Sequence, residues 1–342
     1  MDYHRLARTS VHRWWRTVLG TLFILVGGLF LAVFAYAAVT LTVRLGARAD
    51  LAVAFLSVAA LLPLTLLAAR WIQRRPAGTL SSVTGRLRWR FLLTLLPVAL
   101  VAVVVLLAGG LGLASLTGVE DTGLTDEPAG WGPFALSMGL LLLVVPAQAA
   151  AEEYLTRGWL LQAVGAWFRR PWVPIAFQAL VFAAAHGWGT PWGFADLFVF
   201  GAVTGWLTVR TGGLEAAIAL HVMNNLLATG VAAAYDQLTI TETAADMPWQ
   251  MFAVDLLVLP AYAWVVLRLA ASGHVARRAQ HGEGAQGLGA GDGLVVLGLD
   301  GQGHLDRLPD PGGLGHVGRL GRGGDGLLEL DRQPQRADHH DR

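Results

Sequence analysis

Eight apolar stretches of about 20 residues follow one another between positions 17 and 271 of the 342-residue chain. A helix needs about 20 predominantly apolar residues to cross the hydrocarbon core of a bilayer. The sequence therefore predicts an all-α, polytopic membrane protein whose transmembrane helices form a bundle. The predicted spans are roughly 17–42, 51–72, 91–116, 133–153, 172–190, 193–209, 213–234 and 250–271.

Composition agrees with a membrane protein and excludes several kinds of chemistry. Hydrophobic residues make up 54% of the chain and charged residues only 14%, whereas about a quarter of a soluble domain is charged. The chain has no cysteine, so disulfides, iron–sulfur clusters and thiol catalysis are excluded. All basic residues other than histidine are arginines, which favours a GC-rich bacterial source.

The charged residues predict the orientation of the spans. Arginine-rich connections alternate with acidic ones, and arginine-rich segments stay in the cytoplasm. We therefore expect a multi-pass protein of the plasma membrane with both termini in the cytoplasm. Arg44 and Arg48, in the first connection, do not follow the alternation. A cleaved leader over residues 1–37 is the less favoured alternative, because its apolar core is longer than usual.

Three regions follow from this pattern. Residues 1–16 form a basic cytoplasmic segment, residues 17–272 form the transmembrane domain, and residues 273–342 form a tail. Within the transmembrane domain, residues 130–235 carry the motifs. Residues 273–342 are rich in glycine and have neither a helical nor a strand period. Such a composition buries too little apolar surface to offset chain entropy, so we predict a disordered tail.

Two adjacent carboxylates, Glu152 and Glu153, end the fourth span in 149-AAAEEYLTR-157. An ionisable residue in hydrocarbon is costly and is a functional hypothesis by default. Arg157 lies four residues after Glu153, which places the two side chains on one helix face. We predict a structural Glu153–Arg157 ion pair that leaves Glu152 facing a cavity. The alternative is that both glutamates lie at the cytoplasmic surface.

His186 ends the small-residue helix 182-FAAAH-186, with Phe182 one turn earlier. If 169-RRP-171 is the turn of a helical hairpin, His186 and Glu152 lie at nearly the same depth, because each is a similar number of residues from the turn. That requires the fourth helix to continue beyond the bilayer to about Phe168. Alone, His186 is more often a packing residue than a catalyst.

The seventh span carries 221-HVMNN-225, in which His221 and Asn225 share a helix face. Such side chains in hydrocarbon need hydrogen-bond partners. Interhelical hydrogen bonding is the alternative role, and we favour it for Asn224. Glu215, near the start of this helix, is expected to reach the cytoplasmic edge.

These side chains together suit hydrolysis of a peptide bond. Glu152 would take a proton from water, and His186 would position that water. His221 and Asn225 would donate hydrogen bonds to the developing oxyanion. In a metal-assisted alternative, Glu152, His186 and His221 would hold Zn²⁺ with water in the open position. The common H-E-x-x-H zinc motif is absent, and the sequence does not decide between the two.

The segments 152-EEYLTR-157, 182-FAAAH-186 and 221-HVMNN-225 resemble the E-E-x-x-x-R, F-x-x-x-H and H-x-x-x-N/D motifs of the CPBP intramembrane proteases. These are also called the CAAX prenyl protease 2 or Abi family and include proteins like the lysostaphin resistance protein A. The resemblance covers roughly residues 130–235. It implies a helical membrane fold with a cavity open towards the cytoplasm and Glu152 as the water-activating base. His186 would lie beside this base, His221 and Asn225 would be the oxyanion donors, and Glu153 and Arg157 would support the site.

The predicted function is thus an intramembrane endopeptidase that acts on a membrane-associated protein or peptide. Its predicted partners are the lipid bilayer and that substrate, with no nucleic acid. Two other functions use the same residues: a proton-coupled transporter with a carboxylate–histidine relay, and a membrane scaffold or immunity protein that cleaves nothing. Transporters often contain internal repeats, and none is visible between the two halves of the sequence.

Overall fold

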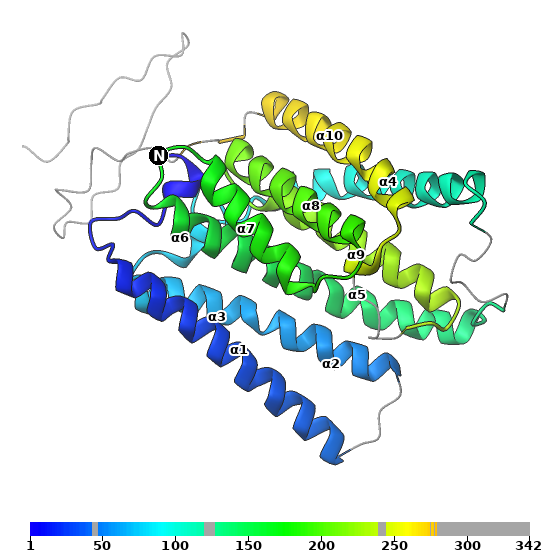
Figure 1. Cartoon of the computed structure of the whole chain (residues 1–342). Helices are drawn as coiled ribbons and strands as arrows, with labels where there is room; N and C mark the ends of the chain where they lie inside the picture. The colour runs from blue at the N-terminus through cyan, green and yellow to red at the C-terminus, as the bar shows by residue number, and fades with distance from the viewer. Residues whose placement is uncertain (43–46, 120–126, 239–243, 274, 277, 279–342) are drawn as a thin grey trace, which may run out of the picture. The chain divides into compact units, whose positions relative to one another are not determined.

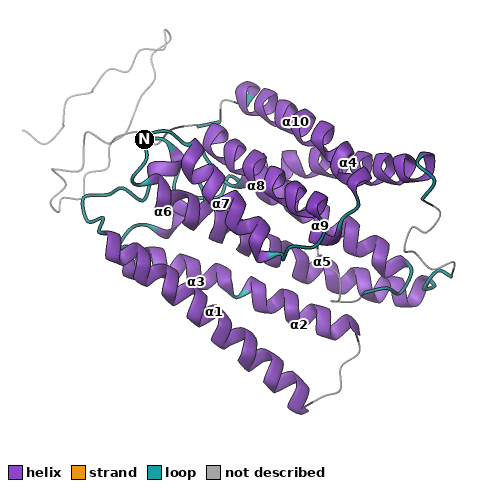
Figure 2. Cartoon of the chain, viewed as in Figure 1, coloured by secondary structure: helices purple, strands orange, loops and turns teal. Residues whose placement is uncertain are grey.

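The computed structural model describes residues 1–42, 47–119, 127–238, 244–273, 275, 276 and 278. Within these residues every regular element is a helix, and the two isolated bridge pairs do not extend into strands (Figure 2). The predicted all-α class is therefore confirmed. The predicted disordered tail lies almost wholly outside the described residues.

Among the described residues, seven helical segments are long and apolar enough to cross a membrane. They correspond to seven of the eight predicted spans, and Figure 1 shows how their helices are arranged. The helices are α1 (Trp14–Thr42), α2 (Ala47–Ala59), α3 (Leu61–Leu67), α4 (Trp89–Leu116), α5 (Trp131–Glu153), α6 (Leu161–Gly165), α8 (Pro191–Thr211), α9 (Glu215–Ala234) and α10 (Trp249–Ser272). Here α2 and α3 form one span with the π-helical segment η2 (Ala68–Ile72), and α5 and α6 form another with the π-helical segment η4 (Tyr154–Leu160).

The fifth predicted span, 172–190, is wrong in its length. Its helix, α7 (Trp172–Ala185), has 14 residues, which corresponds to about 21 Å at 1.5 Å per residue. Gly187 and Gly189 end the helical conformation, because both have positive φ, at 91° and 42°. Gly189 also has no room for a side chain: a Cβ there would lie 2.1 Å from the carbonyl oxygen of Ala245. The α7 helix therefore ends just before His186.

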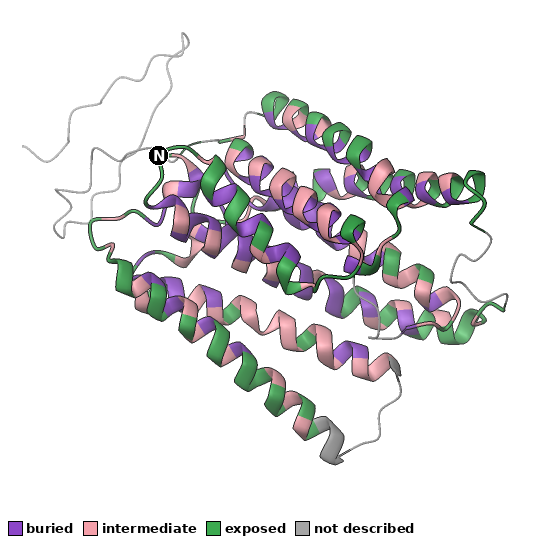
Figure 3. Ribbon diagram, viewed as in Figure 1, coloured by how far each residue is buried: buried purple, intermediate pink, exposed green. Residues whose placement is uncertain are grey.

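Large apolar side chains on the outside of the bundle indicate the lipid-facing surface. On α1, Val26, Leu29, Phe30 and Phe34 are all more than 60% exposed, and exposed residues recur along α10 (Figure 3). A soluble protein rarely exposes a contiguous apolar surface of this kind. Together with the seven apolar helices, this surface identifies a multi-pass membrane protein.

The centre of the bundle is α9, which packs against α4, α5 and α8. Its residues from Glu215 to Val222 are all buried. The short α7 packs against α8, and their backbones approach closely at Gly201, where a Cβ would lie 2.9 Å from the Cα of Ala179. The central position of α9 and the close α7–α8 contact hold the motif-bearing helices together.

The sequence suggested that the side chain of Glu215 reaches the cytoplasmic edge of the membrane, but the structure shows a different arrangement. It is fully buried and accepts two hydrogen bonds from the guanidinium of Arg88, at 2.5 and 2.9 Å. Arg88 also donates to the carbonyl oxygens of Thr211 and Ala276. This arginine therefore ties the beginning of α9 to the ends of α8 and α10.

The structure explains why Arg48 departs from the alternation of charged connections. Its guanidinium is paired with Asp236, just after α9, and donates to Ser137 of α5 at 2.8 Å. The acidic partner lies on the same side of the bundle. The charge of Arg48 is therefore compensated locally, whereas Arg44 lies outside the described residues.

Candidate active site

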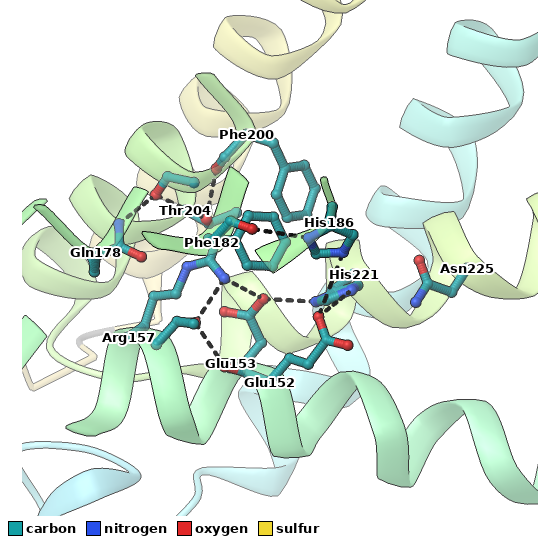
Figure 4. Close-up of polar contacts among 12 residues, drawn as sticks. Glu152, Glu153, Arg157, Gln178, Phe182, His186, Phe200, Thr204, His221 and Asn225 are labelled. Carbon is teal, nitrogen blue, oxygen red and sulfur yellow. Dashed lines mark hydrogen bonds and ion pairs between the residues drawn. The ribbon is translucent and has the colours of Figure 1, made fainter. Parts of the chain in front are cut away.

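The carboxylate of Glu152 lies on a helical rod that is longer than a membrane span. The α5 helix continues without a break through η4 and α6 to Gly165, 35 residues in all. The sequence predicts that Glu152 and His186 lie at the same depth only if the fourth helix continues beyond the bilayer. The structure provides this continuation and brings the two side chains together (Figure 4).

Glu152 faces both histidines of the motifs. Its Oε2 atom lies 3.9 Å from Nε2 of His186 and 3.8 Å from Nε2 of His221. These separations are too long for direct hydrogen bonds and leave the space that a bridging water or ion needs. The side chains of Glu152 and His186 are 18% and 23% exposed, so this point can be reached from outside the protein core.

The hydrogen bonds of the two imidazoles fix which nitrogen faces Glu152. Nδ1 of His186 lies 2.9 Å from the carbonyl oxygen of Phe182, and Nδ1 of His221 lies 2.8 Å from Oε1 of Glu153. A carbonyl oxygen and an ionised carboxylate only accept hydrogen bonds. Each Nδ1 must therefore carry the proton, and in the neutral rings both Nε2 lone pairs point towards Oε2 of Glu152.

The predicted Glu153–Arg157 ion pair is present and is completely buried. Nη1 of Arg157 lies 3.0 Å from Oε1 of Glu153, and both side chains have no exposed surface. The guanidinium lies over the rings of Phe182 and Phe200, at 4.3 and 5.7 Å from their centroids. The alternative that both glutamates lie at the surface is therefore wrong for Glu153. This carboxylate joins the buried arginine to His221.

Asn225 is connected to the site through a residue that the sequence analysis did not single out. Nδ2 of Asn225 donates to Oε1 of Gln148 at 3.0 Å, and Nε2 of Gln148 donates to Oε1 of Glu152 at 2.5 Å. Gln148 is buried and precedes Glu152 by four residues. That spacing places two side chains on one helix face, which is the signal that would have identified it.

Phe182 is the common neighbour of the charged and aromatic side chains. Its ring centroid lies 4.7 Å from that of His186 and 5.9 Å from those of His221 and Phe200. The ring also lies under the guanidinium of Arg157. Phe182 therefore shields the buried ion pair and limits the rotation of both imidazoles.

The donor set suits a metal ion chemically, since imidazole and carboxylate are common zinc ligands. Metal-binding histidines usually donate their other ring N–H to a carboxylate or carbonyl, as His186 and His221 do here. Among the described residues, however, no group of three or more such side chains is already arranged to hold an ion. Coordination by Glu152, His186 and His221 would require these side chains to move closer together.

Comparisons with known proteins agree with the motif pattern. Residues 134–227, which contain every site residue named above, match the family model described as type II CAAX prenyl endopeptidase Rce1-like. A curated relative is the uncharacterized protein YyaK of Bacillus subtilis (strain 168), which is 25% identical over 179 residues. The alignment covers 48% of this chain and 55% of the relative, so the chain matches about half of that protein's length. No solved structure gives a significant match. The resemblance predicted from the three motifs is confirmed for the motif-bearing region.

Proposed function

We propose that this membrane protein is an intramembrane endopeptidase of the CAAX-protease type, in which Glu152 activates the water that cleaves the peptide bond. The family match over residues 134–227 supports the reaction class. The observation that carries the mechanism is the convergence of one Glu152 oxygen and two imidazole nitrogens at separations of 3.8 and 3.9 Å.

The first step is activation of water between these acceptors. A water there would donate one hydrogen bond to Oε2 of Glu152 and the other to Nε2 of His186, so that its oxygen lone pair faces the substrate. As the water oxygen bonds to the carbonyl carbon, its first proton passes to Glu152. Glu152 then delivers this proton to the amine nitrogen as the C–N bond breaks, and the second proton of the water leaves when the new carboxylic acid ionises. General acid–base transfer by a positioned side chain contributes about 10²–10⁴-fold to a rate.

The oxyanion would be stabilised by the groups on α9. One N–H of the Asn225 amide is used by Gln148, and the other is available to the oxyanion. His221 donates its Nδ1 proton to Glu153, so it has an Nε2 proton for the oxyanion only as an imidazolium. Glu153 would then hold that imidazolium in place, as the buried aspartate does in serine-protease triads.

Zn²⁺ remains an alternative way to activate the water. Glu152, His186 and His221 would be its ligands, and the ion would supply a bound water of lowered pKa. The hydrogen bonds of the two Nδ1 atoms support this proposal because they orient both Nε2 atoms as ligands. Metal content of the purified protein, compared between the wild type and His186→Ala, tests the proposal without an activity assay.

We further propose that the site lies near the cytoplasmic face of the plasma membrane, with both termini in the cytoplasm. Glu152 follows Trp131 by 21 residues on one continuous rod, which is about 32 Å at 1.5 Å per residue. That distance is close to the thickness of the hydrocarbon core, about 30 Å. The substrate would be a membrane-associated protein or peptide whose scissile bond lies near that surface.

Profiling of peptide termini in the membrane proteome tests the proposed function. Cells with the wild-type protein are compared with cells carrying Glu152→Gln at matched protein level. Asp50→Asn is the control, because it makes the same carboxylate-to-amide change in the first turn of α2. We expect a set of termini that disappears with Glu152→Gln and persists with Asp50→Asn. An unchanged set would contradict proteolysis and favour the scaffold. Proton flux in vesicles that depends on Glu152 would favour the transporter.

A further inference from the structure

A groove on the outside of the bundle runs along α8, between α7 and α10. Its volume is about 630 Å³, and all the residues that line it are apolar or aromatic. The walls include Trp172 of α7 and Trp264 of α10, each 61% exposed, and Trp206 of α8. None of the proposed catalytic residues lines it. The groove is therefore separate from the candidate active site.

Two arginines stand one helical turn beyond two of the groove's tryptophans. The guanidinium of Arg210 lies 5.8 Å from the ring centroid of Trp206, and that of Arg268 lies 5.1 Å from Trp264. Both arginines are exposed, and neither has a carboxylate partner within the part of the chain that the structure describes. The groove thus ends beside two cationic groups whose charge is not compensated.

Both arginines lie at the same end of the groove because α8 and α10 run in the same direction. Their beginnings are joined through Thr190, which donates to the carbonyl oxygens of Ala245 and Met247. Their ends are joined through Arg88, which donates to Thr211 and Ala276. The wall residue Trp172 directly follows the basic 169-RRP-171 turn. This is therefore the end of the bundle that carries basic connections.

We propose that this groove binds an anionic phospholipid, with one acyl chain along α8 and the phosphate on Arg210 and Arg268. The groove extends from Trp206 to Phe198 on α8, which is about 6 to 18 Å from Arg210 along the helix axis. Half of a hydrocarbon core is about 15 Å thick, so the groove has the depth of one leaflet. Guanidinium groups pair strongly with phosphate oxygens, and basic pockets between transmembrane helices bind lipid head groups.

Native mass spectrometry of the purified full chain tests this site. The protein is presented with equal amounts of a phosphatidylglycerol and a phosphatidylcholine that have the same acyl chains. Each arginine near an anionic lipid contributes about fivefold to binding, so the wild type should retain phosphatidylglycerol at least about tenfold better. Arg210→Gln with Arg268→Gln should reduce that preference to near parity. Ala202→Phe, which places a large ring in the groove, should lower retention of both lipids.

The matched control is Arg13→Gln with Arg16→Gln. Arg16 also stacks on a tryptophan, 5.3 Å from the centroid of Trp15, but neither residue lines the groove. This variant should keep the wild-type preference, and equal thermal midpoints should show that every variant is folded. Equal retention of the two lipids by the wild type would overturn the proposal. So would an unchanged preference in the Arg210 and Arg268 variant, or a second copy of the chain crosslinked through Ala202→Cys in the groove.

Discussion

Removal of Arg157 should show how much the buried ion pair contributes to the free energy of unfolding. Both side chains of the Glu153–Arg157 pair are fully buried, and breaking such a pair by removing one partner typically costs about 3–5 kcal/mol. Arg157→Met also replaces a guanidinium that lies over Phe182 and Phe200, although methionine can still pack on both rings. We therefore expect the free energy of unfolding to fall by about 4 kcal/mol, because Glu153 is left buried with an uncompensated charge.

The double variant Glu153→Gln with Arg157→Met distinguishes an ion pair from packing. Replacing both charges of a buried pair by neutral groups often costs little, and the new side-chain amide would still accept the hydrogen bond of His221 through its oxygen. We expect the double variant to be more stable than the Arg157→Met single variant. The free energies come from reversible unfolding in mixed micelles, followed by circular dichroism during titration with a denaturing detergent.

The Arg48–Asp236 pair is the control for this cycle. Its side chains are 32% and 61% exposed, and exposed pairs contribute about 0–1 kcal/mol. Arg48→Met should therefore cost much less than Arg157→Met. A cost below about 1 kcal/mol for Arg157→Met would refute a stabilising ion pair. So would additivity, in which the effects of the two single substitutions at Glu153 and Arg157 sum to that of the double variant within about 0.5 kcal/mol.

Three further predictions concern other parts of the structure. Gln148→Leu removes the hydrogen bonds to Glu152 and Asn225 and should reduce formation of product termini about tenfold, as expected for a lost bond worth about 1.4 kcal/mol. Gln178→Leu changes a buried residue outside the site and should leave product formation unchanged. An equal loss in both variants would contradict a specific role of Gln148 in the reaction. Burial lowers the pKa of His4 below its usual 6.5, so the unfolded state binds more protons and stability falls as pH decreases through about 6.5. The thermal midpoint of His4→Gln should therefore fall less between pH 7.5 and 5.5 than that of the wild type, and an identical fall in the two proteins would disprove this. Gly201→Val places a Cβ 2.9 Å from the Cα of Ala179 and should lower the free energy of unfolding by at least about 1–3 kcal/mol. Gly139→Val is the control, because a Cβ there meets no atom of the described residues within 4 Å; equal unfolding free energies of the two variants would exclude close α7–α8 packing as the cause.

The sequence predicts the helical membrane fold well because apolar length is a local property. Seven long spans and a short eighth helix follow the apolar stretches. The apolar stretch overestimates the length of α7 because hydropathy does not register the backbone conformations of Gly187 and Gly189. The η4 segment was not predicted either, since a π-helical turn depends on how the surrounding helices pack more than on any residue pattern within it.

The candidate site was predictable where its contacts are local. Glu153 and Arg157 are one turn apart, and their ion pair follows from helical periodicity. The bond between His221 and Glu153 joins residues 68 positions apart, and the Arg88–Glu215 pair joins residues 127 apart. No periodicity within one sequence indicates such pairings, because they depend on which helices become neighbours.

The protonated Nδ1 atoms of His186 and His221 have a consequence for inhibitor design. With neutral imidazoles and an ionised Glu152, the centre of the site presents only lone pairs. A fragment that places a carboxylate, sulfonate or ketone oxygen between Oε2 of Glu152 and the two Nε2 atoms meets acceptors there, and its hydrogen bonds would have to come from the Asn225 amide or from a protonated His221. A fragment with an amidine, an ammonium group or a hydroxamic acid supplies the missing donors. We therefore expect fragments with donors or cations to bind between Glu152 and the two imidazoles more tightly than fragments with acids.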